Sequence, residues 1–409
     1  MAKAAVFGAA GVSGWGLCRA LLDYPAKTTF DSVIGLTLHP VTRETDYLTT
    51  DGRLALYSGI DLTAEEGQVE RQLRQTPGFC QVTHVYYVGT ACGLSRTYDF
   101  GETAKINLQM FQTTLRATVG LCQKLEHFSW QSGSLWYGGP FRAHVQKMGV
   151  PLPPPPFSES GPRLPDPIAQ MIPFYGQHDL MDAFHQAGAG NAPSTWTWTS
   201  PRADTIIGFA PHVSPHNLAL SLGSYLAMVR LLSPDGAELA FPGTRASYAA
   251  AFTVTTQTHL AQTTIQLSLA AKTHPALSDQ AFNISTDYSE PVTWEALWPR
   301  LLSFFGLRGV GPAADRDKMP FGVEWVERNR ELLADAEANV ALLVRGLDKR
   351  VSWQYLEFLL GAEVERALDT SKVTALVQKS GWQVELAKAE DAFFSAWKQA
   401  QETHLLPKF

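Results

Sequence analysis

Short, mainly apolar runs alternate with stretches of helical periodicity through the first half of the chain. The apolar runs cover residues 4–7, 32–38, 54–57, 82–88, 128–134 and 195–199. Runs of this kind are typical of strands buried on both faces in a parallel sheet. Between them, apolar residues recur at helical spacing over residues 17–22, 107–125 and 172–184. The pattern predicts an α/β fold built on a buried parallel sheet.

The alternation loosens in the second half. The pattern there predicts helices over residues 217–232, 294–305 and 324–345, a strand at 281–283, a turn at 241–243, and mostly helical structure over 350–409. Residues 206–211 are expected to form a loop beside the cleft.

This change of pattern predicts two parts. Residues 1–211 form the first, and residues 212–409 form a mainly helical second part from which some segments return to the sheet. The proline-rich residues 150–166 are expected to be an extended connector, with a polyproline interaction motif as the alternative.

Three glycines follow the first apolar run. Gly8, Gly11 and Gly14 stand between the strand and the helical stretch, which is the context that a dinucleotide-binding loop requires. Gly8 would allow the tight turn, Gly11 the approach of a pyrophosphate, and Gly14 close packing of helix on strand. We expect backbone from Gly8 to Gly14, including Ala10 and Val12, to bind the phosphates at the helix N-terminus. An ordinary β–α turn is the alternative.

The end of the second predicted strand bears on the choice of cofactor. An acidic residue there would bind a ribose hydroxyl, whereas this chain has Leu38 and His39, with Arg43 four residues beyond His39. His39 or Arg43 could bind a 2′-phosphate, so NADPH is the expected cofactor and NADH is the alternative. Arg43 could equally be a solvated loop cation.

Other cofactor contacts are expected after the later strands. Asp61 and Leu62 could hold the adenine edge, although Asp61 could also cap a helix. Gly89 and Thr90 are expected beside the nicotinamide ribose, and Ile206 beside the cleft.

Composition limits the possible partners. Of the 409 residues, 45% are apolar and 18% are charged, with a net charge of −6, so a nucleic-acid surface is not expected. No apolar run reaches the ~18 residues of a membrane span, and no signal-peptide pattern opens the sequence, so we expect a cytoplasmic protein. The four cysteines lack metal-ligand spacing and are expected to be buried thiols. No metal site is predicted.

Several stretches together resemble one family, the progesterone 5β-reductase and iridoid synthase-like (PRISE) branch of the short-chain dehydrogenase/reductases. Their order and spacing carry the resemblance. They are Gly8–Gly14, Asp61–Leu62, His84–Val88, Ser132–Phe141, Phe174–Leu180, Ile207–Pro211, Phe241–Gly243, Ala281–Asn283 and Trp294–Trp298. The resemblance implies a doubly wound Rossmann sheet with a smaller, mainly helical substrate-capping part. It also implies reduction of enones with NADPH.

The resemblance implies catalytic residues only in part. Tyr175 aligns with the family's active-site tyrosine, whose phenol would hydrogen-bond the substrate carbonyl. Leu135 occupies the position of the family's lysine, and Asp179 the position where ordinary short-chain dehydrogenases carry it. Ser132 and Ser134 stand at a strand exit, where either hydroxyl could polarise a carbonyl.

The expected function is NADP(H)-dependent reduction of an enone or ketone on a small apolar metabolite, such as a terpenoid or polyketide, in secondary metabolism. Two alternatives tolerate the missing lysine. One is a redox-silent cyclase or isomerase with the same scaffold, and the other is a regulator that senses the dinucleotide. The expected partner is the apolar substrate, and a homodimer is a further expectation.

Overall fold

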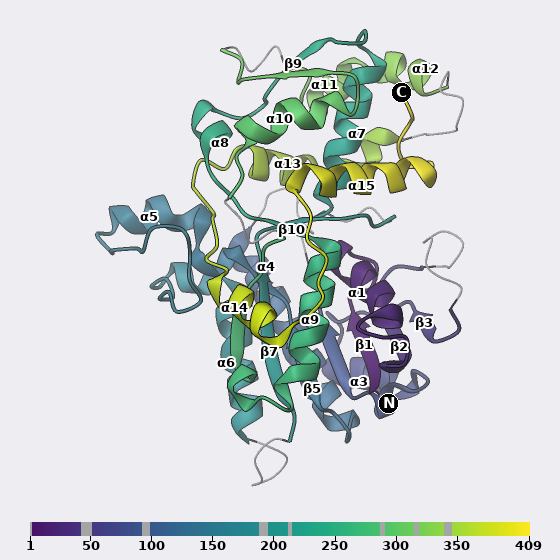
Figure 1. The fold of residues 1–409 in the computed structure, drawn as a ribbon, viewed down its shortest axis with the longest axis vertical. Coiled ribbons are helices and arrows are strands. Elements are labelled where there is room, and N and C mark those ends of the chain that lie inside the picture. Colours follow the sequence, from purple (N-terminus) through teal and green to yellow (C-terminus); the bar gives the residue numbers. More distant parts are fainter. Residues whose placement is uncertain are drawn as a thin grey trace.

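The computed structural model of the chain describes residues 2–41, 51–91, 99–187, 195–211, 215–286, 291–314, 319–338 and 346–409. Figure 1 shows a sheet flanked by helices in its lower part, with a group of helices gathered above the sheet. The chain therefore combines an α/β part with a smaller helical part.

The central sheet has eight strands in the order β11-β7-β5-β4-β1-β2-β3, and β6 also pairs with β7. All of its described pairs are parallel. The strands are β1 (Ala2–Phe7), β2 (Phe30–Leu36), β3 (Leu54–Tyr57), β4 (His84–Tyr87), β5 (His127–Trp130), β6 (Ser132–Gly133), β7 (Thr197–Ala203) and β11 (Gln280–Asn283). This is a doubly wound Rossmann sheet, as the resemblance implied.

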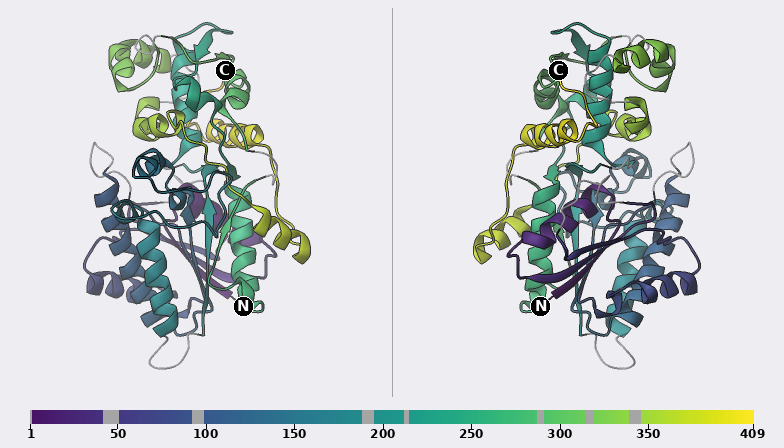
Figure 2. Two further views of the ribbon diagram at one scale, coloured as in Figure 1. Left: turned by 90° about the vertical axis from the view of Figure 1, so that its left-hand side faces the viewer. Right: turned by 90° about the vertical axis from the view of Figure 1, so that its right-hand side faces the viewer.

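Helices cover both faces of the sheet (Figure 2). One face carries α1 (Val12–Asp23) and α9 (Gln257–Ala271), and the other carries α3 (Glu66–Gln75), α4 (Phe100–Leu121) and α6 (Pro173–Ala187). Residues of β1 divide between two apolar cores, with Ala4 and Val6 in the core of α1 and Ala5 and Phe7 in that of α4. Burial on both faces explains why the strands are apolar along their whole length.

The second half supplies most of the helical part above the sheet. Its elements are α7 (Leu218–Leu231), α8 (Arg245–Ala249), α10 (Trp294–Ser303), α11 (Val323–Arg328), α12 (Arg330–Ala338), α13 (Trp353–Leu360) and α15 (Ala389–Glu402), with the strand pair β9 (Glu238–Ala240) and β12 (Arg308–Val310). Near the sheet lie α14 (Ser371–Ser380), the short α5 (Arg142–Lys147), and the pair β8 (Thr205–Ile207) and β10 (Val254–Thr256). Among the described residues, no helix is both long and apolar enough to cross a bilayer.

One glutamine joins α9 to the first half of the chain. The Gln257 amide donates hydrogen bonds to the carbonyl oxygens of Val12 and Phe209. Its side chain fills the space that a Cβ would need at both Gly16 and Gly208. This contact fixes α9 against α1 and against the segment after β8.

Two predicted elements differ from the structure. Residues 206 and 207, the start of the loop expected over 206–211, belong instead to β8 (205–207), because β10 pairs with it in parallel and satisfies its backbone groups. The predicted helix over 324–345 is interrupted at Asn329, which ends α11 before α12 begins, and residues 339–345 lie outside the described residues.

Candidate functional site

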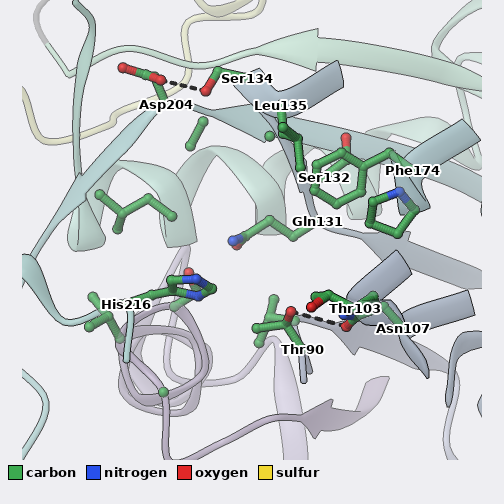
Figure 3. A pocket seen from close by; sticks show the side chains of 18 of the residues that line it. Thr90, Thr103, Asn107, Gln131, Ser132, Ser134, Leu135, Phe174, Asp204 and His216 are labelled. Carbon is green, nitrogen blue, oxygen red and sulfur yellow. Dashed lines mark hydrogen bonds between the residues drawn. The ribbon is translucent and has the colours of Figure 1, made fainter. Parts of the chain in front are cut away.

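A cavity of about 280 Å³ lies at the carboxyl ends of the strands, between the sheet and the helical part. Ligands of doubly wound sheets bind at this edge, where β1 has β2 on one side and β4 on the other. Figure 3 shows the lining side chains from the segments that follow β4, β5 and β7, and from α4 and α6. The cavity brings together eight of the residues predicted for the site: Gly11, Val12, Gly14, Gly89, Thr90, Ser132, Ser134 and Ile206.

The glycine turn has the geometry that its spacing predicts. Gly8 has a φ of +87°, and a Cβ there would lie 2.9 Å from the backbone of Gly89. A Cβ on Gly14 would overlap the carbonyl oxygen of Gly8. The N–H of Gly11 donates to that same oxygen over 3.1 Å, and Gly11 is the N-cap of α1. The helix N-terminus, Gly11–Gly14, therefore lines the cavity, whereas Gly8 and Ala10 are not among the lining residues.

Asn107 holds the segment that follows β4. Its Oδ1 accepts hydrogen bonds from the Thr90 hydroxyl over 3.0 Å and from the Ala91 N–H over 2.9 Å. Its Nδ2 donates to the carbonyl oxygens of Ala91 and Thr103. Thr90 is thereby oriented at the lower edge of the cavity in Figure 3.

Asp61, Leu62 and His39, which were predicted to contact the cofactor, are not among the residues that line this cavity. Asp61 accepts hydrogen bonds from the N–H and the hydroxyl of Thr63. It does not cap α3, which begins at Glu66, so the helix-cap alternative is wrong. Leu62 is buried near Gly89, and His39 is exposed. Arg43 lies outside the described residues.

The upper edge of the cavity is polar. Ser134 donates a hydrogen bond to Asp204 (Figure 3). The same carboxylate accepts from the Thr205 hydroxyl over 3.1 Å and pairs with Nε of Arg366 over 3.3 Å. Both members of this ion pair are buried. The hydroxyl of Ser132 instead bonds that of Ser200 over 2.8 Å.

Tyr175 does not reach the cavity. Its hydroxyl donates to the Trp136 carbonyl oxygen over 2.7 Å and accepts from the Leu164 N–H over 3.0 Å. Burial raises the pKa of this phenol. The residues of α6 that line the cavity include Phe174 and Gln177. The placement therefore gives no support to contact between Tyr175 and a substrate carbonyl.

The position of the family's lysine does face the cavity, and Leu135 stands there. In the described lining there is no lysine. Within the same described ranges, no cluster of side chains is suited to hold a metal ion. Leu135 therefore places an apolar side chain in the lining next to Ser134, where the family carries a lysine.

Four residues that line the cavity were not predicted from the sequence: Gln131, Asp204, His216 and Arg366. Gln131 directly follows β5, and in Figure 3 its amide points into the cavity between Ser134 and Thr90. Asp204 directly follows β7, so both could have been found as the first polar residue after a parallel strand. Burial lowers the pKa of His216, on the opposite wall, to about 4, so its ring is neutral at neutral pH.

Known proteins match most or nearly all of this chain. The PRISE-like Rossmann-fold domain matches residues 4–407. The short chain dehydrogenase sirR of Leptosphaeria maculans is 37% identical over 413 aligned positions, covering 99% of this chain and 97% of that protein. The 3-oxo-Delta(4,5)-steroid 5-beta-reductase of Arabidopsis thaliana is 26% identical, over 69% of this chain and 65% of its own length.

The fold also matches solved structures. Gre2 of Candida albicans in complex with NADPH superposes with a TM-score of 0.56 at 11% identity, covering 99% of this chain and all (100%) of that one. At this identity the likeness concerns the fold. The family match over nearly the whole chain, with the sirR relative, agrees with the sheet and glycine turn described above. The chain belongs to the family of PRISE-like Rossmann-fold domains.

Proposed function

We propose that the protein is an NADP(H)-dependent reductase of an enone or ketone on a small apolar metabolite in secondary metabolism. One observation carries this proposal. A single cavity joins the bare backbone of Gly11 and Gly14 to an apolar wall containing Leu135 and Phe174, with the Gln131 amide between them. The proposal fits relatives that are named short chain dehydrogenases and a steroid 5-beta-reductase.

The proposed nucleotide lies with its pyrophosphate over Gly11–Gly14. There the α1 N-terminus supplies N–H donors and positive potential. The preference for NADPH is supported by Leu38 and His39, since neither offers a carboxylate that would bind a 2′-hydroxyl and repel a 2′-phosphate. Residues 1–211 supply this proposed nucleotide site, and residues 212–409 cap the substrate.

The nicotinamide supplies hydride when it is bound. Of the chain's own groups, the Gln131 amide is placed to donate a hydrogen bond to a substrate carbonyl as negative charge develops on its oxygen. The Ser134 hydroxyl, which donates a hydrogen bond to Asp204, is a second polar group in the cavity lining. Conjugate addition suits this site, because the resulting enolate can take its proton from water without a buried lysine or tyrosine acid.

A second candidate is a redox-silent cyclase or isomerase. It is favoured by the enclosure of the Tyr175 hydroxyl between Trp136 and Leu164, and by Leu135 in the lysine position. Such an enzyme would use the same cavity to fold an apolar substrate and would polarise its carbonyl through Gln131.

The test measures loss of NADPH absorbance with a panel of cyclic enones and ketones. We expect turnover, and we expect Gln131→Leu to lower kcat/KM by about 10²-fold, since an oxyanion donor is lost, while the NADPH Kd stays the same. Gln123→Leu, an exposed glutamine outside the cavity lining, is the matched control. Conversion of substrate without NADPH consumption would favour the second candidate. Absence of affinity for any nicotinamide nucleotide would overturn the proposal.

A further inference from the structure

We propose that Arg366, beside Asp204 and Ser134, forms a subsite for a second, uncharged carbonyl oxygen of the substrate. This inference rests on the proposed function, since it takes the cavity as the substrate site. It adds a substrate class, namely apolar molecules with one carbonyl that reaches Gln131 and another that reaches the upper edge in Figure 3.

The backbone of Arg366 is fixed. Its N–H donates to the Ala251 carbonyl oxygen over 2.7 Å, and its backbone forms an isolated parallel β-bridge with Phe252. The guanidinium lies over the Phe252 ring, with Cζ 5.4 Å from the ring centroid. The side chain is buried, yet the residue belongs to the cavity lining. Arg366 is therefore held in place before any ligand arrives.

The guanidinium keeps unused hydrogen-bonding capacity. Its Nε pairs with Asp204, and neither Nη1 nor Nη2 has a hydrogen-bond partner among the residues that the structure describes; Nη2 is fully enclosed, whereas Nη1 is not. Buried donors are almost always satisfied, by protein, water or ligand. Because Arg366 lines the cavity and its Nη1 is not enclosed, this nitrogen is the one that a ligand oxygen can reach.

The charge balance selects an uncharged acceptor. Asp204 already neutralises Arg366, and this carboxylate is itself buried. A carboxylate ligand would bring a second negative charge beside Asp204, in a site of low dielectric where like charges repel strongly. A ketone, ester or amide oxygen accepts the same hydrogen bond without that repulsion.

Other parts of the cavity wall are apolar. Leu135 lines the cavity from the segment after β6, and Phe358 and Leu359 line it from α13. Phe358 is 43% exposed, an unusual exposure for a large aromatic side chain. A substrate would therefore present hydrocarbon along these walls and place its second oxygen against Arg366.

The experiment compares three probes of similar shape on protein saturated with NADP⁺: 2-acetylnaphthalene, 2-ethylnaphthalene and 2-naphthoate. Binding is followed by calorimetry or by quenching of tryptophan fluorescence. We expect the acetyl probe to bind about 10-fold more tightly than the ethyl probe, as one hydrogen bond to a charged donor allows, and more tightly than the naphthoate.

The double variant Asp204→Asn/Arg366→Met removes both charges, so that no unpaired ion stays buried. We expect it to bind the acetyl and ethyl probes equally within about twofold, and to keep its NADP⁺ affinity. Arg230→Met is the matched control. Arg230 also combines an ion pair, to Asp235 at 3.5 Å, with a buried nitrogen lacking a described partner, but it lies outside the cavity lining.

The inference is overturned if the wild type does not distinguish the acetyl and ethyl probes, if the naphthoate binds best, or if the double variant keeps the carbonyl preference. Titration with NADP⁺ alone tests the proposed function separately. Nucleotide binding and enone turnover without carbonyl preference would remove only the Arg366 subsite. If no nucleotide binds, the probes are compared on the nucleotide-free protein, and carbonyl preference there would remove only the proposed reductase.

Discussion

Phe174 and Tyr175 are neighbours in the sequence with opposite surroundings. Successive residues of a helix point about 100° apart, so the Phe174 ring lines the cavity while the Tyr175 phenol packs among Trp136 and Leu164. Both bonding positions of the hydroxyl are satisfied by buried backbone. This explains how a motif can resemble a catalytic one while its phenol serves the packing of the fold.

Tyr175→Phe tests this assignment. Removing the hydroxyl leaves a buried N–H and a buried carbonyl oxygen without their partner, so we expect a loss of about 1–3 kcal/mol in the free energy of unfolding. We expect kcat/KM to change less than about tenfold, against the ~10²-fold expected of an oxyanion donor. Tyr225→Phe is the control, because the buried Tyr225 hydroxyl has no partner among the described residues. A large loss of turnover with unchanged stability would restore the catalytic role.

The role of a single residue can be predicted from the sequence when its partners lie close to it along the chain. The glycine turn and the aliphatic Leu135 could be read from neighbours in the chain. The pairing of Arg366 with Asp204 joins positions 162 residues apart, and no local pattern signals it. The Asp61 carboxylate, which we considered as a helix cap, satisfies Thr63 instead because α3 begins later.

At the scale of elements, the β1–α1 unit was the most predictable part of the fold. Its turn depends on glycine spacing, which is local, and its strand on an unbroken apolar run. Strand β8 was missed because its partner β10 lies about fifty positions further along the chain. The order of the sheet strands likewise depends on long-range pairing, and was expected only through the family resemblance.

Gly14→Ala tests the close packing of α1 on the turn. The added methyl would overlap the Gly8 carbonyl oxygen, which is backbone and cannot rotate away. We expect a cost of about 1–3 kcal/mol in stability and at least a tenfold weaker NADPH Kd. Gly120→Ala in α4 is the control, since no atom lies within 4 Å of the new methyl. That variant should gain about 0.5–1 kcal/mol and bind NADPH normally. Equal nucleotide affinity in both variants would contradict the proposed site.

At the scale of the whole molecule, buried histidines make stability depend on pH. His259 in α9 is fully buried, and burial lowers its pKa to about 4 from an ordinary value of about 6.5. Between these values the unfolded chain binds the proton and the folded chain does not, so acidification favours unfolding. Stability is fully present above about pH 6.5 and falls progressively down to pH 4; the loss from this one histidine is about 2 kcal/mol at pH 5.

Chemical denaturation at pH 7.5 and pH 5 measures this effect. His259→Gln should lose about 2 kcal/mol less than the wild type on acidification, because the group that takes up the proton is gone. The exposed His274, replaced by glutamine, should leave the difference between the two pH values unchanged. Identical pH dependence in all three proteins would contradict the assignment.

The two hydrogen bonds from Gln257 to Val12 and Phe209 limit how segments can be exchanged between relatives. A chimera that joins residues 1–211 of this chain to the counterpart of residues 212–409 from another family member would place a foreign α9 against α1 and a foreign β11 in the sheet. The two parents would have to match at Gly16 and Gly208 as well as at the junction. Shuffling substrate preference within this family should therefore succeed by exchanging α13 and the Arg366 segment, and fail when the cut follows the boundary between the two halves.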